Sequence, residues 1–180
     1  MLRFAHLVLL GLFGAAAVHL AILFLLPAYS ERDMWSALAA KHDLYTFTRL
    51  GKDDANALLA EKQNPFLEEA ACRFDLENGM TWLSAETRVP FWSFSVYDRD
   101  GINVFNVNDR GAENGKLDAL IMNAPQLLEL RKEMPEMVST SLIAQTDLDE
   151  GIVVVRVFQP DKSWRATIER FFQELRCSAL

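Results

Sequence analysis

Residues 91–110, FWSFSVYDRDGINVFNVNDR, contain two runs of alternating apolar and polar side chains on either side of Asp100-Gly101. This alternation is typical of β-strands with one buried face, and Asp-Gly tolerates the positive φ angles of a tight turn. The segment therefore predicts an antiparallel hairpin in which the numbers of paired residues sum to 201. On its apolar face, Trp92, Phe94 and Val96 would lie opposite Asp109, Val107 and Phe105.

The other face of this hairpin carries mostly hydroxyl and amide groups. Ser93, Ser95 and Tyr97 would lie opposite Asn108, Asn106 and Val104, with Arg110 at the far end. Such a row can bind an extended polar ligand or another chain, and it equally fits the solvated face of a sheet. The candidate ligand-binding residues are Ser93, Ser95, Tyr97, Asn106, Asn108 and Arg110.

Further strands flank the hairpin. Asn78-Gly79 predicts a second hairpin, which would place Cys72, Phe74, Leu76, Thr81, Leu83 and Ala85 on one core face. Residues 117–124 and 140–146 are predicted strands, separated by a helix over 126–132. Residues 152–158 are apolar on both faces except at Arg156, which is typical of a central strand covered from both sides.

Helical periodicity appears at both ends of this region. After a capping pattern at Ser30 and Asp33, a helix is expected through Met34, Trp35, Leu38, Ala39, His42 and Tyr45. His42 on that face is a packed residue or, alternatively, a catalytic one. A short helix is expected over 55–61, and a last helix, capped by Asp161 or Ser163, carries the stripe Trp164, Ile168, Phe171, Phe172 and Leu175. The predicted fold class is α+β, an antiparallel sheet or sandwich flanked by helices.

Residues 7–26 contain no charge, and twenty residues of helix span about 30 Å, the thickness of a bilayer core. We expect an uncleaved transmembrane helix; the alternative is a signal peptide removed after Ala15-x-Ala17. The predicted organisation is an anchor over 1–29, a helical juxtamembrane segment over 30–69 and an α+β domain over 70–180.

The charges that flank this segment predict its orientation. Arg3 and the α-amino group precede it, whereas a mixed set, Glu31, Arg32 and Asp33, follows it. By the positive-inside rule the N-terminus is cytoplasmic, and in a Gram-negative cell the domain is periplasmic and anchored in the inner membrane.

Gly11, Ala15 and His19 recur every four residues and share one stripe of the predicted anchor. Small residues at this spacing let a second helix approach, which would make the partner a companion membrane protein or another copy of the chain. Alternatively, small residues are simply common in membrane helices, and His19 bonds to water or a carbonyl.

The net charge of −7, from 18 basic and 25 acidic residues, argues against nucleic-acid binding. Of the three histidines only His42 lies outside the N-terminal region, which excludes a soluble metal site with two imidazoles. Asp98-x-Asp100-Gly101 has the spacing of a calcium loop, but Asn103 stands where that loop needs glycine, so a hairpin turn is favoured. No serine-hydrolase motif or phosphate loop occurs; we therefore predict no catalytic residues, metal or cofactor.

The two cysteines admit three interpretations. Cys72 falls on the inward face of a strand and Cys177 follows the last helix, so in an oxidising compartment they form a disulfide across 105 residues. On the chain-entropy model this bridge is worth about 4.7 kcal/mol. The alternatives are a free buried Cys72 or a nucleophilic Cys72 paired with His42.

Several short motifs together resemble one bacterial family: Cys72-Arg73-Phe74-Asp75-Leu76, Trp92-Ser93, Tyr97-Asp98-Arg99-x-Gly101-x-Asn103, Asn108-Asp109-Arg110 and Arg176-Cys177. The chain resembles the short single-pass membrane members of the domain of unknown function 1254 family. The resemblance implies no catalytic residues. It implies a companion, since similar short proteins are encoded beside a small membrane protein that carries a second unknown domain.

Taken together, these patterns favour a membrane-anchored interaction or assembly module of the cell envelope. The alternative is an envelope enzyme or binding protein that holds a small polar or saccharide ligand on the Ser/Asn face of the 91–110 hairpin.

Overall fold

The computed structural model describes residues 2–29, 34–40, 42–50, 66–112 and 115–180. The chain begins with the long helix α1 (Leu2–Tyr29). Within it, Arg3–Phe24 is apolar and long enough to cross a membrane, and it is not buried against the rest of the chain. It is the only such helix among the residues described, and both an anchor and a signal sequence have these properties.

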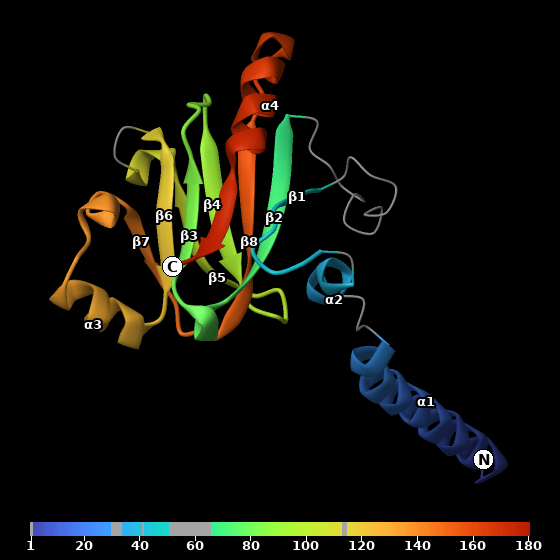
Figure 1. Ribbon diagram of the computed structural model, residues 1–180. Coiled ribbons are helices and arrows are strands. Elements are labelled where there is room, and N and C mark those ends of the chain that lie inside the picture. Colours follow the sequence, from blue (N-terminus) through green and yellow to red (C-terminus); the bar gives the residue numbers. More distant parts are fainter. Residues whose placement is uncertain (1, 30–33, 41, 51–65, 113–114) are drawn as a thin grey trace.

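In the part of the chain that the structure describes, nine strands form two sheets that face each other (Figure 1). Sheet A has the order β1 (Thr48–Arg49), β2 (Leu67–Asp75), β8 (Glu150–Phe158), β4 (Trp92–Tyr97) and β5 (Asn103–Asn108). Sheet B has the order β7 (Leu142–Gln145), β6 (Leu117–Met122), β3 (Thr81–Ala85) and β9 (Arg176–Ala179). Neighbouring strands are antiparallel, except that β6 and β7 are parallel. The α+β fold class is thus confirmed.

Among the described residues, three shorter helices flank the sheets: α2 (Met34–Ala39), α3 (Ala124–Lys132) and α4 (Arg165–Glu174). The helix predicted over 126–132 is confirmed as α3, and it begins two residues earlier because Asn123 and Gln126 form a capping box. In the predicted last helix, Asp161 instead caps a 3₁₀ turn, Lys162–Trp164, and α4 follows it. Ile168 and Phe171 of α4 are buried, as predicted, whereas Trp164 is exposed.

The main core lies between the two sheets. It combines large side chains of sheet A with those of sheet B and α4: Phe74, Trp92, Phe94, Val155, Leu83, Ile121 and Phe171. Cys72 of β2 and Cys177 of β9 form a disulfide. The bridge therefore ties sheet A to sheet B, and it excludes the free and nucleophilic alternatives for Cys72.

The hairpin over residues 91–110 is confirmed from Ser93 to Val96, where the paired numbers sum to 201. The turn also forms as predicted, since Gly101 has φ 80° and the Asp98 carboxylate accepts a hydrogen bond from the backbone of Ile102. Two pairings are corrected. A β-bulge places Tyr97 opposite Asn103 rather than Val104, and Asp109 begins a 3₁₀ turn instead of facing Trp92.

The hairpin predicted around Asn78-Gly79 is wrong. Strand β2 pairs with β1 and β8, and β3 pairs with β6 and β9, so the two segments belong to different sheets. Residues Leu76–Asn78 form a 3₁₀ turn, after which Gly79 at φ 129° redirects the chain. The predicted core face is nevertheless correct, since Cys72, Phe74, Leu76, Thr81, Leu83 and Ala85 are all buried.

The helix after residue 30 is shorter than predicted. It ends at Ala39, and the turn that follows brings Tyr45 to φ 60°, where its hydroxyl donates a hydrogen bond to the carbonyl of Asp75. The helix predicted over 55–61 falls outside the described residues. The strand β9 after α4 was not predicted, while the central place of β8 was.

Candidate functional site

The candidate site lies on the outer face of sheet A, the face that points away from sheet B. Its centre is Arg156, which interrupts the apolar run 152–158 of the central strand β8. Strand β8 pairs on one side with β2 and on the other with β4, so Arg156 lies directly between Glu69 and Ser93. Side chains from three strands thereby converge on one guanidinium group.

Each of the three nitrogens of the Arg156 guanidinium donates a hydrogen bond. Its Nε donates to Glu69 Oε1 at 2.8 Å, and its two terminal nitrogens donate to Ser95 Oγ and Tyr97 Oη, each at 3.1 Å. Both members of the ion pair with Glu69 are about 30% exposed, at 27% and 31%. A half-buried guanidinium that satisfies a carboxylate and two hydroxyls holds three strands in fixed register.

This network changes the acidity of its members. Burial raises the pKa of Tyr97, but the hydrogen bond and charge of Arg156 outweigh it, and the net pKa lies below its ordinary value. Burial likewise lowers the pKa of Arg156, but Tyr97 and Glu69 more than compensate and raise it. Arg156 is therefore a permanent cation.

The predicted polar row is divided by this arrangement. Ser95 is buried and Tyr97 is half-buried, and both accept hydrogen bonds from Arg156; Ser93 is half-buried beside them. Across the hairpin, Asn106 is exposed, and the Asn108 side chain accepts from the backbone of Arg110. The exposed Arg110 therefore belongs to a 3₁₀ turn, not to a continuous ligand-binding row.

Beside Arg156, helix α2 covers an apolar strip of the same face. Trp35 and Leu38 of α2 join Leu50 in a small core against Ala71, Ile152 and Val154 of sheet A. Two guanidinium groups lie over the Trp35 ring, Arg73 at 5.1 Å and Arg99 at 5.3 Å. Such cation–π contacts fix the indole ring between apolar and charged surroundings.

A pocket of about 190 Å³ remains between α2 and the sheet. Trp35, Ile152 and Val154 supply apolar walls, while Tyr97, Asp98, Arg99, Gly101 and Arg156 surround them. The pocket fits a small molecule with an apolar body and a polar edge. Within the part of the chain that the structure describes, no group of three His, Cys, Asp or Glu residues is placed to hold a metal ion.

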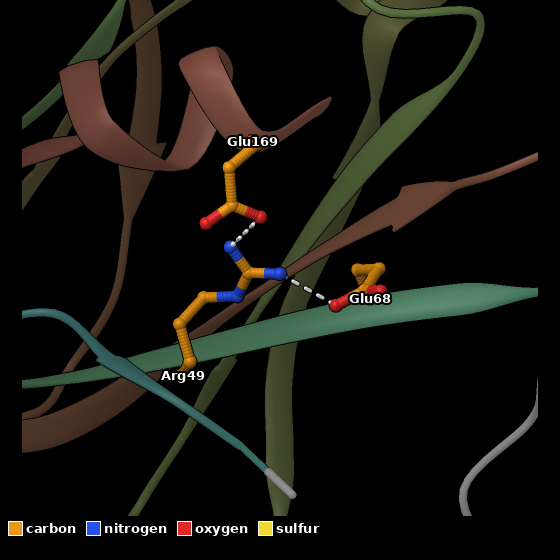
Figure 2. A network of polar contacts seen from close by, with 3 residues as sticks. All are labelled: Arg49, Glu68 and Glu169. Carbon is orange, nitrogen blue, oxygen red and sulfur yellow. Dashed lines mark hydrogen bonds and ion pairs between the residues drawn. The ribbon is translucent and has the colours of Figure 1, made fainter. Parts of the chain in front are cut away.

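A second arginine network has a structural role. Arg49 of β1 bonds to Glu68 of β2 at 2.6 Å and to Glu169 of α4 at 3.3 Å (Figure 2). Its guanidinium also lies 4.1 Å from the ring centre of Phe172. Arg49 therefore attaches α4 to the edge of sheet A, a contact that no sequence pattern predicts.

Four residues of the site were not predicted as ligand-binding residues from the sequence: Trp35, Glu69, Arg73 and Arg99. A signal for the site is the single arginine in the apolar run 152–158, because such a group needs partners on neighbouring strands. The predicted membrane stripe, Gly11, Ala15 and His19, lies exposed on α1, and a Cβ added at Gly11 would meet nothing within 4 Å.

No protein-family model and no curated protein match the chain. Among solved structures, the VPA0106 protein of Vibrio parahaemolyticus is similar, with a TM-score of 0.57 and 13% identity over 80% of this chain and 32% of that one. An uncharacterised protein of Burkholderia cenocepacia has a TM-score of 0.47 and 14% identity over 80% of this chain and 38% of that one. The chain thus spans about a third of the length of these proteins. At such identity the likeness to the Vibrio protein shows one thing, a shared α+β fold.

Proposed function

We propose that the chain is a membrane-anchored interaction or assembly module of the bacterial cell envelope, with a cytoplasmic N-terminus and a periplasmic sandwich. The observation that carries this proposal is the short connection between α1, which ends at Tyr29, and α2, which begins at Met34. Five residue steps of extended chain reach about 17 Å at most. Because α2 is fixed to sheet A by Trp35 and Leu38, an inserted α1 would hold the sandwich next to the bilayer.

Two further observations support the proposal. The Cys72–Cys177 bridge agrees with an oxidising compartment such as the periplasm. The exposed stripe of Gly11, Ala15 and His19 offers α1 a surface for a second helix, from a companion membrane protein or another copy of the chain. Membership of the domain of unknown function 1254 family, with its companion protein, is part of the same proposal.

Localisation is tested with two reporters fused after residue 180. Alkaline phosphatase, which is active only in the periplasm, should be active, and green fluorescent protein exported by the same route should be dark. The full-length protein should stay in the membrane pellet after carbonate extraction. A soluble protein, or a fluorescent fusion without phosphatase activity, would exclude the proposed anchoring.

The partner is tested by purification from mild detergent. The double substitution Gly11→Leu with Ala15→Leu should abolish co-purification of a membrane protein or of a tagged second copy. The matched control is Ala16→Leu with Ala17→Leu, which enlarges the opposite side of α1 and should leave recovery unchanged. Equal recovery from both double variants would contradict a role for the stripe.

The pocket beside Trp35 favours a second candidate function, the binding of a small polar or saccharide ligand. Its test is a thermal-shift screen of monosaccharides against the wild type and Tyr97→Phe. A ligand of this pocket should raise the melting temperature of the wild type and lose its effect in the variant. A shift that persists in Tyr97→Phe would place the ligand elsewhere.

A further inference from the structure

Helix α3 and the turns after β2, β4 and β7 lie at one end of the sandwich (Figure 1). Their residues line two hollows. The first, which we call the α3 groove, has a volume of about 750 Å³. Its apolar lining comes from Met80, Pro125, Leu128, Leu130 and Leu180. Leu128 is 62% exposed and Leu180 44%, so the groove presents apolar surface that this chain does not cover.

The second, which we call the acidic hollow, has a volume of about 520 Å³. Seven carboxylate side chains and one arginine line it. They come from three neighbouring places in the fold: Asp75 and Glu77 at the end of β2, Asp98 and Asp100 after β4, and Asp147, Asp149 and Glu150 at the start of β8. The arginine, Arg99, pairs with Glu150 at 2.9 Å, which leaves the hollow strongly negative.

The two hollows lie on either side of one turn, Leu76–Asn78, which is held in place. Glu77 lines the acidic hollow, and Gly79, two residues later, lines the α3 groove. The turn between them is fixed from both sides, because the backbone of Leu76 donates to the carbonyl of Asp149 and accepts from the side chain of Gln126 on α3. One ligand a few helical turns long could therefore contact both.

Helix α2, which follows α1 in the chain, also lies near this end of the molecule. Trp35 of α2 and Asp98 line the same pocket, and Asp98 also lines the acidic hollow. With α1 in a bilayer, as proposed above, both hollows lie near the membrane surface. A bilayer with anionic headgroups is a poor occupant, because seven carboxylates would be repelled by it.

We propose that this end docks a short cationic amphipathic segment of a second membrane protein. The apolar side of the segment fills the α3 groove, and its Lys or Arg side chains lie over the acidic hollow. This inference rests on the proposed function and names the chemistry of the partner. Apolar burial supplies affinity, while the negative hollow supplies orientation and a fast, salt-dependent approach.

The test uses the full-length protein in phosphatidylcholine nanodiscs, whose neutral surface does not attract the probe. The probe is a leucine–lysine amphipathic peptide of about 14 residues, or four helical turns, and its counterpart has glutamate in place of lysine. We expect the lysine peptide to bind, and we expect its affinity to fall as the salt concentration rises. The glutamate peptide should not bind.

Substitutions assign the binding to this surface. Leu128→Asn should weaken binding of the lysine peptide about tenfold, since it removes an exposed leucine that the bound peptide would bury. Asp147→Asn with Asp149→Asn should weaken it about fivefold at low salt and flatten the salt dependence. The matched controls are Val104→Asn, an exposed apolar residue on β5, and Glu86→Gln, an exposed acid after β3.

Three results would overturn the proposal: equal binding of the two peptides, equal losses in test and control variants, or binding in detergent micelles that vanishes in nanodiscs. The last result would mean that the bilayer itself covers the groove. If the chain is anchored in the membrane but does not bind the lysine peptide, this inference is wrong and the proposed function stands. The anchoring itself is tested separately, by the phosphatase fusion and the carbonate extraction.

Discussion

Arg156 shows how a single residue organises the outer face of sheet A. A charged side chain in a central strand is costly unless its donors are satisfied, and here Glu69, Ser95 and Tyr97 satisfy them. The hydroxyl groups that looked like an open row in the sequence are thus largely used inside the molecule.

Replacing Arg156 should therefore destabilise the domain. Arg156→Met leaves Glu69 without its cation and should lower the free energy of unfolding by about 2–3 kcal/mol in urea denaturation. The comparison is Lys116→Met, which breaks an exposed pair with Glu86 and should cost about 0–1 kcal/mol. Equal costs would show that the Arg156 network adds nothing beyond a surface ion pair.

The tyrosines should ionise in a defined order as the pH rises. The pKa of Tyr97 is lowered, whereas burial above all raises the pKa of Tyr45. A lowered pKa in the folded state contributes stability above the ordinary tyrosine pKa of about 10, and the contribution is lost as the pH falls through the folded value. The free energy of unfolding at neutral pH is therefore not changed by the ionisation of Tyr97.

Ultraviolet titration of tyrosinate checks this order. Tyr97→Phe should remove the earliest step and leave the latest, while Tyr45→Phe should do the reverse. An earliest step that survives in Tyr97→Phe would contradict the assigned influence of Arg156.

At the scale of elements, two glycine turns that look alike in sequence behave differently. Asp100-Gly101 closes a hairpin, whereas Asn78-Gly79 carries the chain from sheet A to sheet B. Both glycines have positive φ, but a Cβ would meet nothing within 4 Å at Gly101 and would overlap the carbonyl oxygen of Leu180 at Gly79.

The two alanine variants should therefore differ in stability. Gly101→Ala should cost about 1 kcal/mol for the left-handed backbone alone, and Gly79→Ala about 2–4 kcal/mol because steric overlap adds to it. Urea denaturation measures both. A smaller loss of stability in Gly79→Ala than in Gly101→Ala would show that the backbone at Leu180 moves aside at little cost.

These elements also show what sequence periodicity can and cannot predict. Alternation correctly assigned the buried faces of β2 and β3, because each side chain's exposure follows from its own strand. It could not give the pairing of β2 with β8, whose partners Cys72 and Val153 lie far apart in the chain. The candidate site was predicted only in part for the same reason. Ser95 and Tyr97 belong to a local hairpin, which the sequence pattern predicts. Arg156, Glu69 and Trp35 are far from this hairpin in the sequence and reach the site through long-range contacts.

For the whole molecule, the disulfide is the covalent link between the sheets. Reducing Cys72–Cys177 frees a loop of 105 residues and should lower the free energy of unfolding by up to about 4.7 kcal/mol. The measurement is urea denaturation with and without dithiothreitol. The control is Cys72→Ala with Cys177→Ala, whose stability dithiothreitol should not change. An unchanged wild-type midpoint after complete reduction would contradict a stabilising bridge.

The position of β8 in sheet A has a consequence for biosynthesis. This strand lies between β2 and β4, yet it is made after both of them and after β5. Until residues 150–158 emerge from the ribosome, β2 lacks its long partner and the hairpin has no sheet to join. Until then the apolar strands of the nascent chain are unpaired and exposed to aggregation.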